Sequence, residues 1–450
     1  MAEIKKILIA NRGEIVQRAI RTIKEMGKKS VAVYSAGDKN ASYLKHADEA
    51  VCIGGAKSSE SYLNIPALIT AAEMTGCDAI FPGYGFLSEN QDFVEICKLH
   101  NIKFIGPSSE VMEKMADKSK AKEEMVRAGV PVVPGSKGAV RTLDEGKKIA
   151  REIGYPIMAK ASAGGGGRGM RLIKEEKDFD SQYLAASSEA LAAFGDGTMY
   201  LERFINNPRH IEVQVIGDSH GNAIHIGERD CSLQRRHQKV IEESPAILLN
   251  DETRAKLHEV AVKATKYLKY EGAGTFEFLA DDKQNIYFME MNTRLQVEHP
   301  VSEMVSGLDI IEWMIKVAEG EKLPPQESIR FRGHAIECRI TAEDPNNFLP
   351  CPGKITQWMV PGGRNVRVDS HIYTNYIVPP YYDSMIGKLI DWGRDKEKAI
   401  NIMKRALSEF EVEGIKTNIP FHKKMMENKD FISNNYDTKY LENYKGLDSI

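Results

Sequence analysis

Hydrophobic residues in the first 110 positions come in short runs that alternate with amphipathic, helix-like stretches. The run KKILIA (5–10) is followed by a polar turn at 11–14 and a helical pattern, and SVAVYSA (30–36) then returns to apolar residues. Two later runs, at 78–90 and 103–108, contain Gly and Pro turns at their carboxyl ends. Strands that alternate with helices predict a doubly wound α/β domain. In such a domain, ligands bind at the carboxyl ends of the strands.

The pattern changes after a polar helical run at 110–128, which the Pro-rich segment GVPVVPGS (129–136) follows. From about 155 to 300, strand-like runs dominate and are interrupted by two long helical stretches, near 178–194 and 251–270. Strands and helices that do not alternate regularly along the chain are typical of an α+β unit. We therefore expect a second domain with a different architecture from the first.

A third unit follows the Pro-rich segment at 323–325, where four more strand-like runs precede a closing helical pattern. This last part of the chain is predicted to be β-rich. With about 150 residues per domain as a guide, a chain of 450 residues predicts roughly three domains. We place them at 1–113, 114–330 and 331–450.

Charge and cysteine usage narrow the possible functions. The 64 acidic and 61 basic residues nearly cancel, so no field of one sign would attract nucleic acid or an anionic membrane. The 6 cysteines are scattered without a CxxC pair, which predicts a reducing compartment, the cytoplasm. The N-terminus is unlike a signal peptide, and no apolar stretch of about 18 residues occurs. We therefore expect no nucleic-acid partner and no membrane partner.

The segment KASAGGGGRGM (160–170) contains four consecutive glycines. It formally includes a GxGxxG pattern, but strand-like residues precede and follow it, whereas a dinucleotide fingerprint must open a helix. No GxxxxGK[ST] occurs in the chain, which excludes a P-loop. A glycine-rich hairpin can instead fold its backbone N–H groups over phosphates, with Lys160 and Arg168 adding positive charge. The alternative is a surface hairpin without a ligand.

Polar and apolar residues alternate strictly between positions 290 and 298. In an extended chain, one side of this segment would carry only Glu290, Asn292, Arg294, Gln296 and Glu298. Upstream, Glu277 lies between two aromatic residues, and it could meet Glu290 across paired strands. Two carboxylates and an amide oxygen are ligands that Mg²⁺ prefers. Arg294 could then hold a small planar anion, and Glu298 could take a proton from it. The alternative is an amphipathic strand with a solvated face.

Other polar groups are less specific. The run RHIEVQVIG also alternates and places His210, Glu212 and Gln214 on one face. A loop before Glu242 and Glu243 gathers four cations, which are Arg235, Arg236, His237 and Lys239. Taken singly, such clusters are more often solvated surface than binding sites. Sequence patterns alone do not place Arg339, on the strand-like run HAIECRI, in a site.

Six segments together resemble the biotin carboxylase family of ATP-grasp enzymes. They are IANRGEI, FPGYGFLSEN, KASAGGGGRGM, ERDCSLQRRHQKVIEESPA, EMNTRLQVEHPV and GHAIECRI. The resemblance extends from about residue 4 to residue 445. It implies an N-terminal doubly wound α/β domain, an ATP-grasp domain whose mobile glycine-rich flap (about 131–204) closes over ATP, and a β-rich C-terminal domain.

The resemblance also implies roles for individual residues. The implied ATP contacts are Lys118, Lys160, Gly166, Gly167, Glu202, Arg203, Phe204, Ile205, His210, Gln234, His237, Glu277 and Glu290. The implied magnesium ligands, which Mn²⁺ could also use, are Glu277, Glu290 and Asn292. The implied bicarbonate contacts are Lys239, Arg294, Gln296 and Val297, and the implied biotin contacts are Tyr84, Gly85 and Arg339. Catalysis would rest on Glu298, Arg294, Arg339 and Lys239.

The implied reaction begins when Glu298 deprotonates bicarbonate, which attacks the γ-phosphate of ATP and forms carboxyphosphate. Carboxyphosphate would decompose to CO₂ and phosphate, the phosphate would take the N1′ proton of biotin, and Arg339 would stabilise the enolate that captures CO₂. The sequence lacks the Ala-Met-Lys-Met signature of a biotinylation site. Biotin is therefore expected on a separate carrier protein, with a separate carboxyltransferase.

The resemblance further implies a homodimer and acetyl-CoA as the final carboxyl acceptor, for malonyl-CoA and fatty acid synthesis. Pyruvate and 2-oxoglutarate carboxylases contain the same type of subunit and stay open as alternatives. A different ATP-grasp ligase would share the Mg-ATP residues but would have no use for Arg339 and Tyr84. A non-catalytic nucleotide sensor would keep the glycine flap without chemistry at Glu298.

Overall fold

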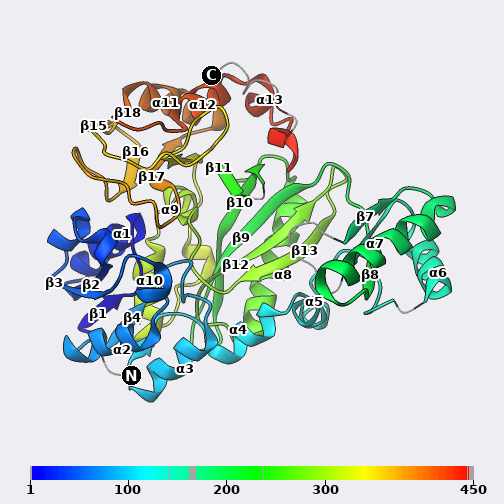
Figure 1. Ribbon diagram of the computed structural model, residues 1–450, viewed down its shortest axis with the longest axis horizontal. Coiled ribbons are helices and arrows are strands. Elements are labelled where there is room, and N and C mark those ends of the chain that lie inside the picture. Colours follow the sequence, from blue (N-terminus) through cyan, green and yellow to red (C-terminus); the bar gives the residue numbers. More distant parts are fainter. Residues whose placement is uncertain (1–2, 141, 162–168, 237, 443, 445–450) are drawn as a thin grey trace.

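The computed structural model describes residues 3–140, 142–161, 169–236, 238–442 and 444, and of residues 118, 119 and 194 only the backbone. In Figure 1 the N-terminal residues (blue) and the C-terminal residues (orange) lie at one end of a central sheet (green), and a small α/β unit lies at the other end. Among the described helices, none is both long and apolar enough to span a bilayer.

The N-terminal sheet is parallel and has the strand order β3-β2-β1-β4-β5. Its strands are β1 (Lys6–Ile9), β2 (Lys29–Ser35), β3 (Glu49–Gly54), β4 (Ala79–Phe81) and β5 (Lys103–Phe104), and its helices are α1 (Glu14–Glu25), α2 (Ile65–Met74) and α3 (Gln91–Leu99). Alternate residues of β1 enter two different cores. Ile7 and Ile9 pack on the side of α1, whereas Leu8 and Ala10 pack on the side of α2 and α3. The prediction of a doubly wound sheet is confirmed, because period-two alternation buries both faces.

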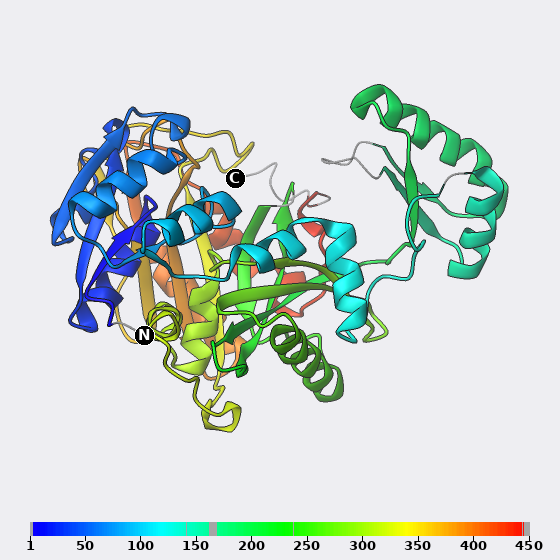
Figure 2. The same cartoon turned by 90° about the horizontal axis from the view of Figure 1, so that it is seen from below.

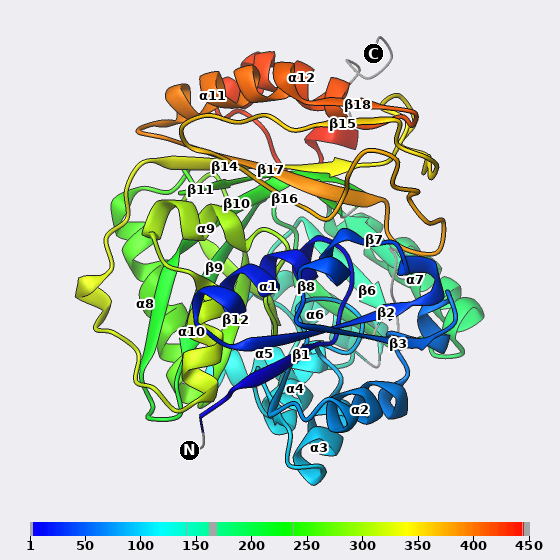
Figure 3. The same cartoon turned by 90° about the vertical axis from the view of Figure 1, so that its left-hand side faces the viewer.

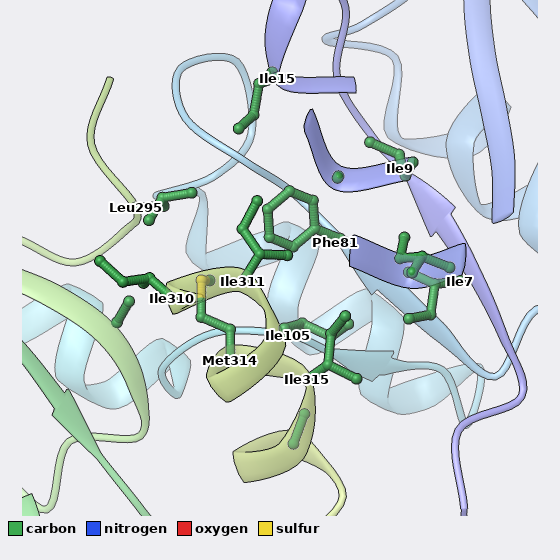
Figure 4. Close-up of a cluster of buried hydrophobic side chains, with 14 of the residues drawn as sticks. Ile7, Ile9, Ile15, Phe81, Ile105, Leu295, Ile310, Ile311, Met314 and Ile315 are labelled. Carbon is green, nitrogen blue, oxygen red and sulfur yellow. The ribbon is translucent and has the colours of Figure 1, made fainter. Parts of the chain in front are cut away.

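The core beside α1 joins the N-terminal domain to the rest of the chain. Figure 4 shows Ile7, Ile9 and Phe81 of the parallel sheet facing helix α10 (Ile310–Ala318). Leu295, from the segment that the sequence singled out as a candidate site, belongs to the same buried cluster. This core therefore anchors one end of that segment.

Two helices replace the single polar helix that the sequence predicts at 110–128. They are α4 (Ser109–Ala116) and α5 (Lys118–Arg127). Asp117, between them, has an extended backbone with φ −86° and ψ 118°. Its side chain accepts a hydrogen bond of 2.9 Å from the Lys120 N–H. The helix breaks there because an aspartate in this position caps the start of a new helix.

A large antiparallel sheet forms the centre of the molecule, in the order β13-β12-β9-β10-β11-β14-β17-β16. Its strands are β9 (Arg209–Gly217), β10 (Ala223–Arg235), β11 (Gln238–Ser244), β12 (Gly272–Ala280), β13 (Ile286–Asn292), β14 (His334–Thr341), β16 (Val366–Ser370) and β17 (Met385–Gly393). Helices α8 (Asp251–Tyr267), α9 (His299–Ser306) and α10 belong to this part of the chain. The sheet continues across the predicted boundary at residue 330, since β11 pairs with β14.

The small unit at the far end, called the flap below, comprises β6 (Ile157–Ala161), β7 (Met170–Ile173), β8 (Met199–Arg203), α6 (Leu143–Ile153) and α7 (Phe179–Phe194). Its antiparallel strands have the order β7-β6-β8. The flap has a hydrophobic core of its own, and Figure 2 shows it standing apart from the central sheet.

The C-terminal residues add helices and a two-stranded antiparallel sheet at the end of the central sheet. These elements are β15 (Gln357–Met359), β18 (Glu411–Glu413), α11 (Lys396–Glu409), α12 (Ile419–Glu427) and α13 (Lys429–Ile432). Figure 3 shows α11 and α12 over one side of β14 and β17, with α1 on the other side. The mixed fold class predicted from the sequence is confirmed: a parallel α/β sheet is followed by antiparallel sheets.

Candidate active site

Lys239 on β11 lies at the centre of the polar residues that the sequence predicts. Its Nζ is 2.5 Å from Glu212 Oε2, 3.0 Å from Glu277 Oε1 and 2.6 Å from Glu298 Oε1. All three carboxylates are buried. Burial lowers the pKa of a lysine, but here the carboxylates outweigh burial and raise the pKa of Lys239 well above its ordinary value. These four residues are called the Lys239 cluster below.

Strand register explains why these acids meet. Glu277 on β12 lies opposite Glu212 of β9 on one side and opposite Glu290 of β13 on the other. Directly opposite residues share a face of the sheet, with Cβ atoms about 5 Å apart. The expectation that Glu277 and Glu290 meet across paired strands is confirmed.

Glu277 collects hydrogen bonds from several of the predicted residues. Asn292 Nδ2 and Gln296 Nε2 each donate to Glu277 Oε1 at 2.8 Å, and His210 Nε2 lies 3.1 Å from Glu277 Oε2. Burial would raise the pKa of Glu277, but Lys239 and His210 hold it well below its ordinary value. Burial likewise opposes the charged form of His210, yet Glu277 raises the His210 pKa to about 9. Both groups are therefore charged near neutral pH.

The predicted extended row from Glu290 to Glu298 is only partly a strand. Strand β13 ends at Asn292, and residues 293–298 form a loop that leads into α9. The ladder stops because the Thr293 N–H donates to Glu89 Oε1 at 3.0 Å and not to a neighbouring strand. Arg294 nevertheless returns to the polar side, where its Nη2 donates to Asn292 Oδ1 at 2.8 Å. The prediction of one continuous polar strand is wrong, but its polar residues still converge.

Arg339 on β14 lies between two buried acids. Its Nε donates to Glu242 Oε1 at 2.5 Å, and its Nη2 donates to Glu298 Oε2 at 2.9 Å. Burial raises the pKa of Glu242 to about 7, although Arg339 opposes the rise. Burial would also raise the pKa of Glu298, but Lys239 and Arg339 hold it below its ordinary value. Glu298 is therefore ionised and can accept a proton.

The predicted biotin residues and most of the predicted bicarbonate residues line a common cavity of about 580 Å³, whereas Gln296 is not part of its lining. From the predicted sets, the lining residues are Lys239, Arg294, Val297, Arg339, Tyr84 and Gly85. The central sheet, the loop before α9 and the N-terminal domain each contribute to this wall. A concave pocket with a few convergent charged groups is the usual setting of a small-molecule site.

A second group of predicted residues lies on the flap. Lys160 of β6 donates to Glu202 of β8 at 2.5 Å, and Lys122 of α5 also pairs with Glu202. Arg203 is exposed, and its Nη2 donates to the Ile153 carbonyl at 2.9 Å. These residues therefore belong to a different sheet from the Lys239 cluster.

The C-terminal segment reaches the connection between the flap and the central sheet. Phe204 is half-buried and Ile205 is buried there. Thr438 N–H donates to the Pro208 carbonyl at 3.1 Å, and Lys439 lies over the Phe204 ring at 5.4 Å from its centroid. Nothing in the local sequence of this segment pointed to that position, because the contact joins residues more than 200 positions apart.

Gln234 is buried at the end of β10, opposite Lys239 in the β10–β11 hairpin. Its amide donates to the Cys231 carbonyl at 2.9 Å. Of the remaining predicted ATP contacts, Gly166, Gly167, His237 and the side chain of Lys118 lie outside the described residues.

Sequence reasoning missed several residues that shape the site. Arg229 is fully buried and donates to Glu212 at 2.6 Å and to Gln296 at 2.6 Å. Glu89 holds Arg294 Nε at 2.9 Å. The alternation of RHIEVQVIG was a signal for Glu212, whereas Arg229 and Glu89 gave no local signal.

Of the predicted cation loop, Lys239 joins the cluster, but Arg235 packs 4.1 Å from the Phe348 ring centroid.

The residues present fit a magnesium ion in part. Glu277 and Glu290 are opposed carboxylates, and oxygen atoms of this kind are the ligands that Mg²⁺ prefers. Asn292, by contrast, turns its amide nitrogen to Glu277 and its oxygen to Arg294. Its oxygen has a second lone pair, which could bind a metal beside Arg294.

Comparisons with known proteins identify the family of the chain. Residues 3–112 match the family described as biotin carboxylase, N-terminal domain, and residues 337–443 match the biotin carboxylase C-terminal domain. Residues 117–326 match the carbamoyl-phosphate synthase L chain, ATP binding domain. A biotin carboxylase of Nostoc sp. is 55% identical over 439 residues, which cover 97% of this chain and 98% of that protein. The chain belongs to the biotin carboxylase family.

Solved structures of the family superpose over almost the whole chain. A biotin carboxylase from Campylobacter jejuni, in a complex described as beta-gamma-ATP, is 68% identical, with a TM-score of 0.91 and coverage of 98% of this chain and 99% of that one. The biotin carboxylase domain dimer of a Hydrogenobacter thermophilus 2-oxoglutarate carboxylase, with MgADP, ADP and bicarbonate, is 49% identical, with a TM-score of 0.90 and full coverage of both chains. The predicted family and enzyme class, a biotin carboxylase ligase that uses ATP, Mg²⁺ and biotin, are confirmed.

Proposed function

We propose that the protein carboxylates biotin on a separate carrier protein, with ATP and bicarbonate, as the first half-reaction of an acetyl-CoA carboxylase. The position of Glu298 is the observation that best supports the proposed residue roles. Its carboxylate lies between Lys239 and Arg339, at 2.6 and 2.9 Å. The cavity beside it is lined by Tyr84, Gly85 and Arg339, the three residues proposed for biotin.

In the first step, Lys239 and Arg294 hold bicarbonate from the cavity wall, with Gln296 and Val297 beside them. Glu298 takes the proton of bicarbonate, which raises its nucleophilicity. A bicarbonate oxygen then forms a bond to the γ-phosphorus while the bond to the ADP oxygen breaks, and carboxyphosphate results. The converging cations offset the negative charge of this step.

Glu277, Glu290 and Asn292 are the proposed magnesium ligands, and Asn292 would use the lone pair of its oxygen that Arg294 does not occupy. When bound, Mg²⁺ withdraws charge from the β- and γ-phosphate oxygens. Mn²⁺ has the same preference for carboxylate and amide oxygens and is expected to substitute.

ATP is proposed to lie between the flap and the central sheet. The proposed contacts are Lys118, Lys160, Gly166, Gly167, Glu202, Arg203, Phe204, Ile205, His210, Gln234 and His237, with Glu277 and Glu290 on the metal side. Lys160 now pairs with Glu202 at 2.5 Å. It would have to exchange this carboxylate for a phosphate when ATP binds. Closure of the flap would then exclude water from carboxyphosphate.

In the second step, carboxyphosphate decomposes to CO₂ and phosphate, and the phosphate takes the N1′ proton of biotin. The contacts of Arg339 with Glu242 and Glu298 use Nε and Nη2. We therefore assign Nη1 to the enolate oxygen of biotin. The enolate then captures CO₂, and carboxybiotin leaves on its carrier.

Acetyl-CoA is the proposed final acceptor. Proteins named only as biotin carboxylases are 55% and 68% identical to this chain, against 49% for the 2-oxoglutarate carboxylase domain. The proposed partners are a biotin carboxyl carrier protein and carboxyltransferase subunits. A homodimer is proposed because the 2-oxoglutarate carboxylase domain is described as a dimer. A location in the cytoplasm stays a prediction from the scattered cysteines. The same half-reaction in a pyruvate or 2-oxoglutarate carboxylase is the alternative.

The half-reaction is tested by phosphate release from the purified protein with Mg-ATP and bicarbonate, with and without free biotin. We expect release to need bicarbonate and to rise several-fold with biotin. Turnover that does not change on adding biotin would count against the proposed reaction. The acceptor is tested by reconstitution with the carrier and transferase subunits, which should transfer label from bicarbonate to acetyl-CoA. Transfer to pyruvate or to 2-oxoglutarate would instead show that the protein belongs to a carboxylase of that acceptor.

A further inference from the structure

Lys388 on β17 is a buried lysine at the edge of the active site to which none of the roles above is assigned. Its side chain is 0% exposed. The ammonium nitrogen lies 3.0 Å from Glu14 Oε1 and donates to the Val297 carbonyl at 2.8 Å. A buried lysine is costly unless it is paired and hydrogen-bonded. Both requirements are met here by residues that border the catalytic cavity.

Glu14, at the start of α1, connects this lysine to the proposed biotin pocket. Its Oε1 accepts hydrogen bonds from Lys388 and from the Tyr84 hydroxyl. Glu14 and Tyr84 both line the 580 Å³ cavity. One carboxylate oxygen is therefore shared by the ammonium and by the wall of the pocket.

The three segments that meet at Lys388 are far apart in the chain. Glu14 belongs to the N-terminal domain, Val297 to the loop before α9, and Lys388 to a C-terminal strand. Figure 3 shows α1 and α9 on the same side of β17. In the β14–β17 pair, Lys388 is also the register partner of Arg339. The pair Glu14–Lys388 thus lies where three parts of the molecule bound one site.

The contact with Val297 acts on the proposed base. The Val297 carbonyl and the Glu298 N–H belong to one planar peptide unit. A hydrogen bond to this carbonyl therefore fixes the orientation of the peptide group that precedes the Cα atom of Glu298. A displacement of about 1 Å at such a residue can cost on the order of 100-fold in rate.

The contact with Glu14 acts on the pocket wall. Burial raises the pKa of Glu14, and Lys388 opposes that rise. Without the ammonium, the pKa of Glu14 would rise further, which disfavours the charged acceptor of the Tyr84 hydroxyl. Hydrogen bonds to ionised acceptors are roughly twice as strong as those between neutral groups.

The nearby Glu337 does not take over this role. It lies on the same strand face as Arg339, and burial raises its pKa well above the ordinary value, although Lys388 opposes the rise. Both of its carboxylate oxygens are buried without a hydrogen-bond partner among the described residues. Among the described residues, Lys388 forms its ion pair with Glu14, at 3.0 Å, and not with Glu337.

We propose that the Glu14–Lys388 pair is a positioning element of the reaction, which orients the Val297–Glu298 peptide on one side and Tyr84 on the other. The proposal rests on the proposed function, because it takes Glu298 as the base and Tyr84 as part of the biotin pocket. Lys388 and Glu14 are positioning residues, since they act through Glu298 and Tyr84.

The test uses Lys388→Met, which keeps the length of the side chain and removes the ammonium. We expect kcat/KM for free biotin to fall about 10- to 100-fold, while KM for ATP changes less than about threefold. Glu14→Gln should reduce the same parameter, because the amide keeps the volume but not the charge. Lys388→Arg, which keeps the charge, should lose less than Lys388→Met. Thermal unfolding of each variant is measured in parallel.

Lys28→Met is the matched control. Lys28 also binds one backbone carbonyl, of Ile4 at 2.7 Å, and one carboxylate, of Glu319 at 2.6 Å. It follows the far end of α1, about 18 Å from Glu14 at 1.5 Å rise per residue. This variant should lose stability but keep kcat/KM for biotin within about twofold of the unchanged protein.

The outcomes separate the two proposals. If the unchanged protein shows no stimulation by biotin, the proposed function fails. If it is stimulated, and both Lys388→Met and Glu14→Gln keep its kcat/KM for biotin, only the positioning role fails. A loss shared equally by Lys28→Met would also overturn that role, since it would reflect general destabilisation. Should Lys388→Met not fold, the double variant Glu14→Gln, Lys388→Met removes both charges together and is read in the same way.

Discussion

Two clusters of buried charge lie along helix α9, and they are built in different ways. Glu298, just before the helix, belongs to the Lys239 cluster. Glu303, inside the helix, belongs to a second group, called the Arg18 cluster. Its members are Arg18, Glu303, Asp309, Arg367 and Asp369.

In the Arg18 cluster, two guanidiniums bridge three carboxylates through directional contacts, because Arg18 and Arg367 share Glu303 and each also pairs with one aspartate. Glu303 Oε1 is 2.8 Å from Arg18 and Glu303 Oε2 is 2.7 Å from Arg367, so each carboxylate oxygen has its own guanidinium. Burial would raise the pKa of Glu303, but Arg18 and Arg367 hold it below its ordinary value. Such a set is satisfied internally and joins α1, α9 and β16.

In the Lys239 cluster, three carboxylates share one ammonium, and one wall opens into a cavity. Each of the three carboxylates also lies beside a further cation, which is Arg229 at Glu212, His210 at Glu277 and Arg339 at Glu298. Buried charge alone therefore does not mark a site. A site is marked by charged side chains that converge on a shared group beside a cavity.

The sharpest test of this contrast is Glu298→Gln. Loss of the base should lower kcat by about 100- to 10,000-fold. The unfolding free energy should change by less than about 1 kcal/mol, because the cluster keeps two carboxylates for Lys239. Steady-state phosphate release and thermal unfolding measure the two effects. If the variant keeps the rate of the unchanged protein, Glu298 is not the base.

Arg18→Met should show the opposite signature. Its loss removes the guanidinium from Asp309 and one of the two guanidiniums from Glu303, and breaking a buried ion pair typically costs about 3–5 kcal/mol of unfolding free energy. The kcat of the folded fraction should stay within about threefold, since Arg18 does not line the cavity. Thermal unfolding and active-fraction kinetics test this. A large fall in kcat without destabilisation would contradict the division into two kinds of cluster.

A smaller effect is expected from the pH dependence of Glu242. Burial raises its pKa to about 7 from an ordinary value of 4.5. The folded state therefore keeps a proton that the unfolded state loses, so the stability due to Glu242 is complete below about pH 4.5 and is lost as the pH rises through about 7. Between pH 5 and 8, the unchanged protein should lose on the order of 1–3 kcal/mol relative to Glu242→Gln. Unfolding curves at several pH values measure this difference, and a gain in stability of the unchanged protein relative to Glu242→Gln as the pH rises would have the wrong sign.

Local periodicity predicted part of the site correctly. Glu277 and Glu290 could be paired in advance because period-two strands that are neighbours in sequence tend to pair, and register then aligns their polar faces. The same reasoning extended the strand too far, to Glu298. Glu89, 204 positions away from Thr293, takes the backbone N–H that the ladder would have used.

The family, the order of α/β and antiparallel units, and the chemical types of the residues around Lys239 could all be predicted from the sequence. These features depend on hydrophobic periodicity, turn residues and motifs, all of which are local along the chain. The contacts by which Arg229, Glu242 and Lys388 support that site are visible only in the folded structure. Their partners lie on distant strands, and a local pattern cannot distinguish a strand residue that faces a buried acid from one that faces solvent.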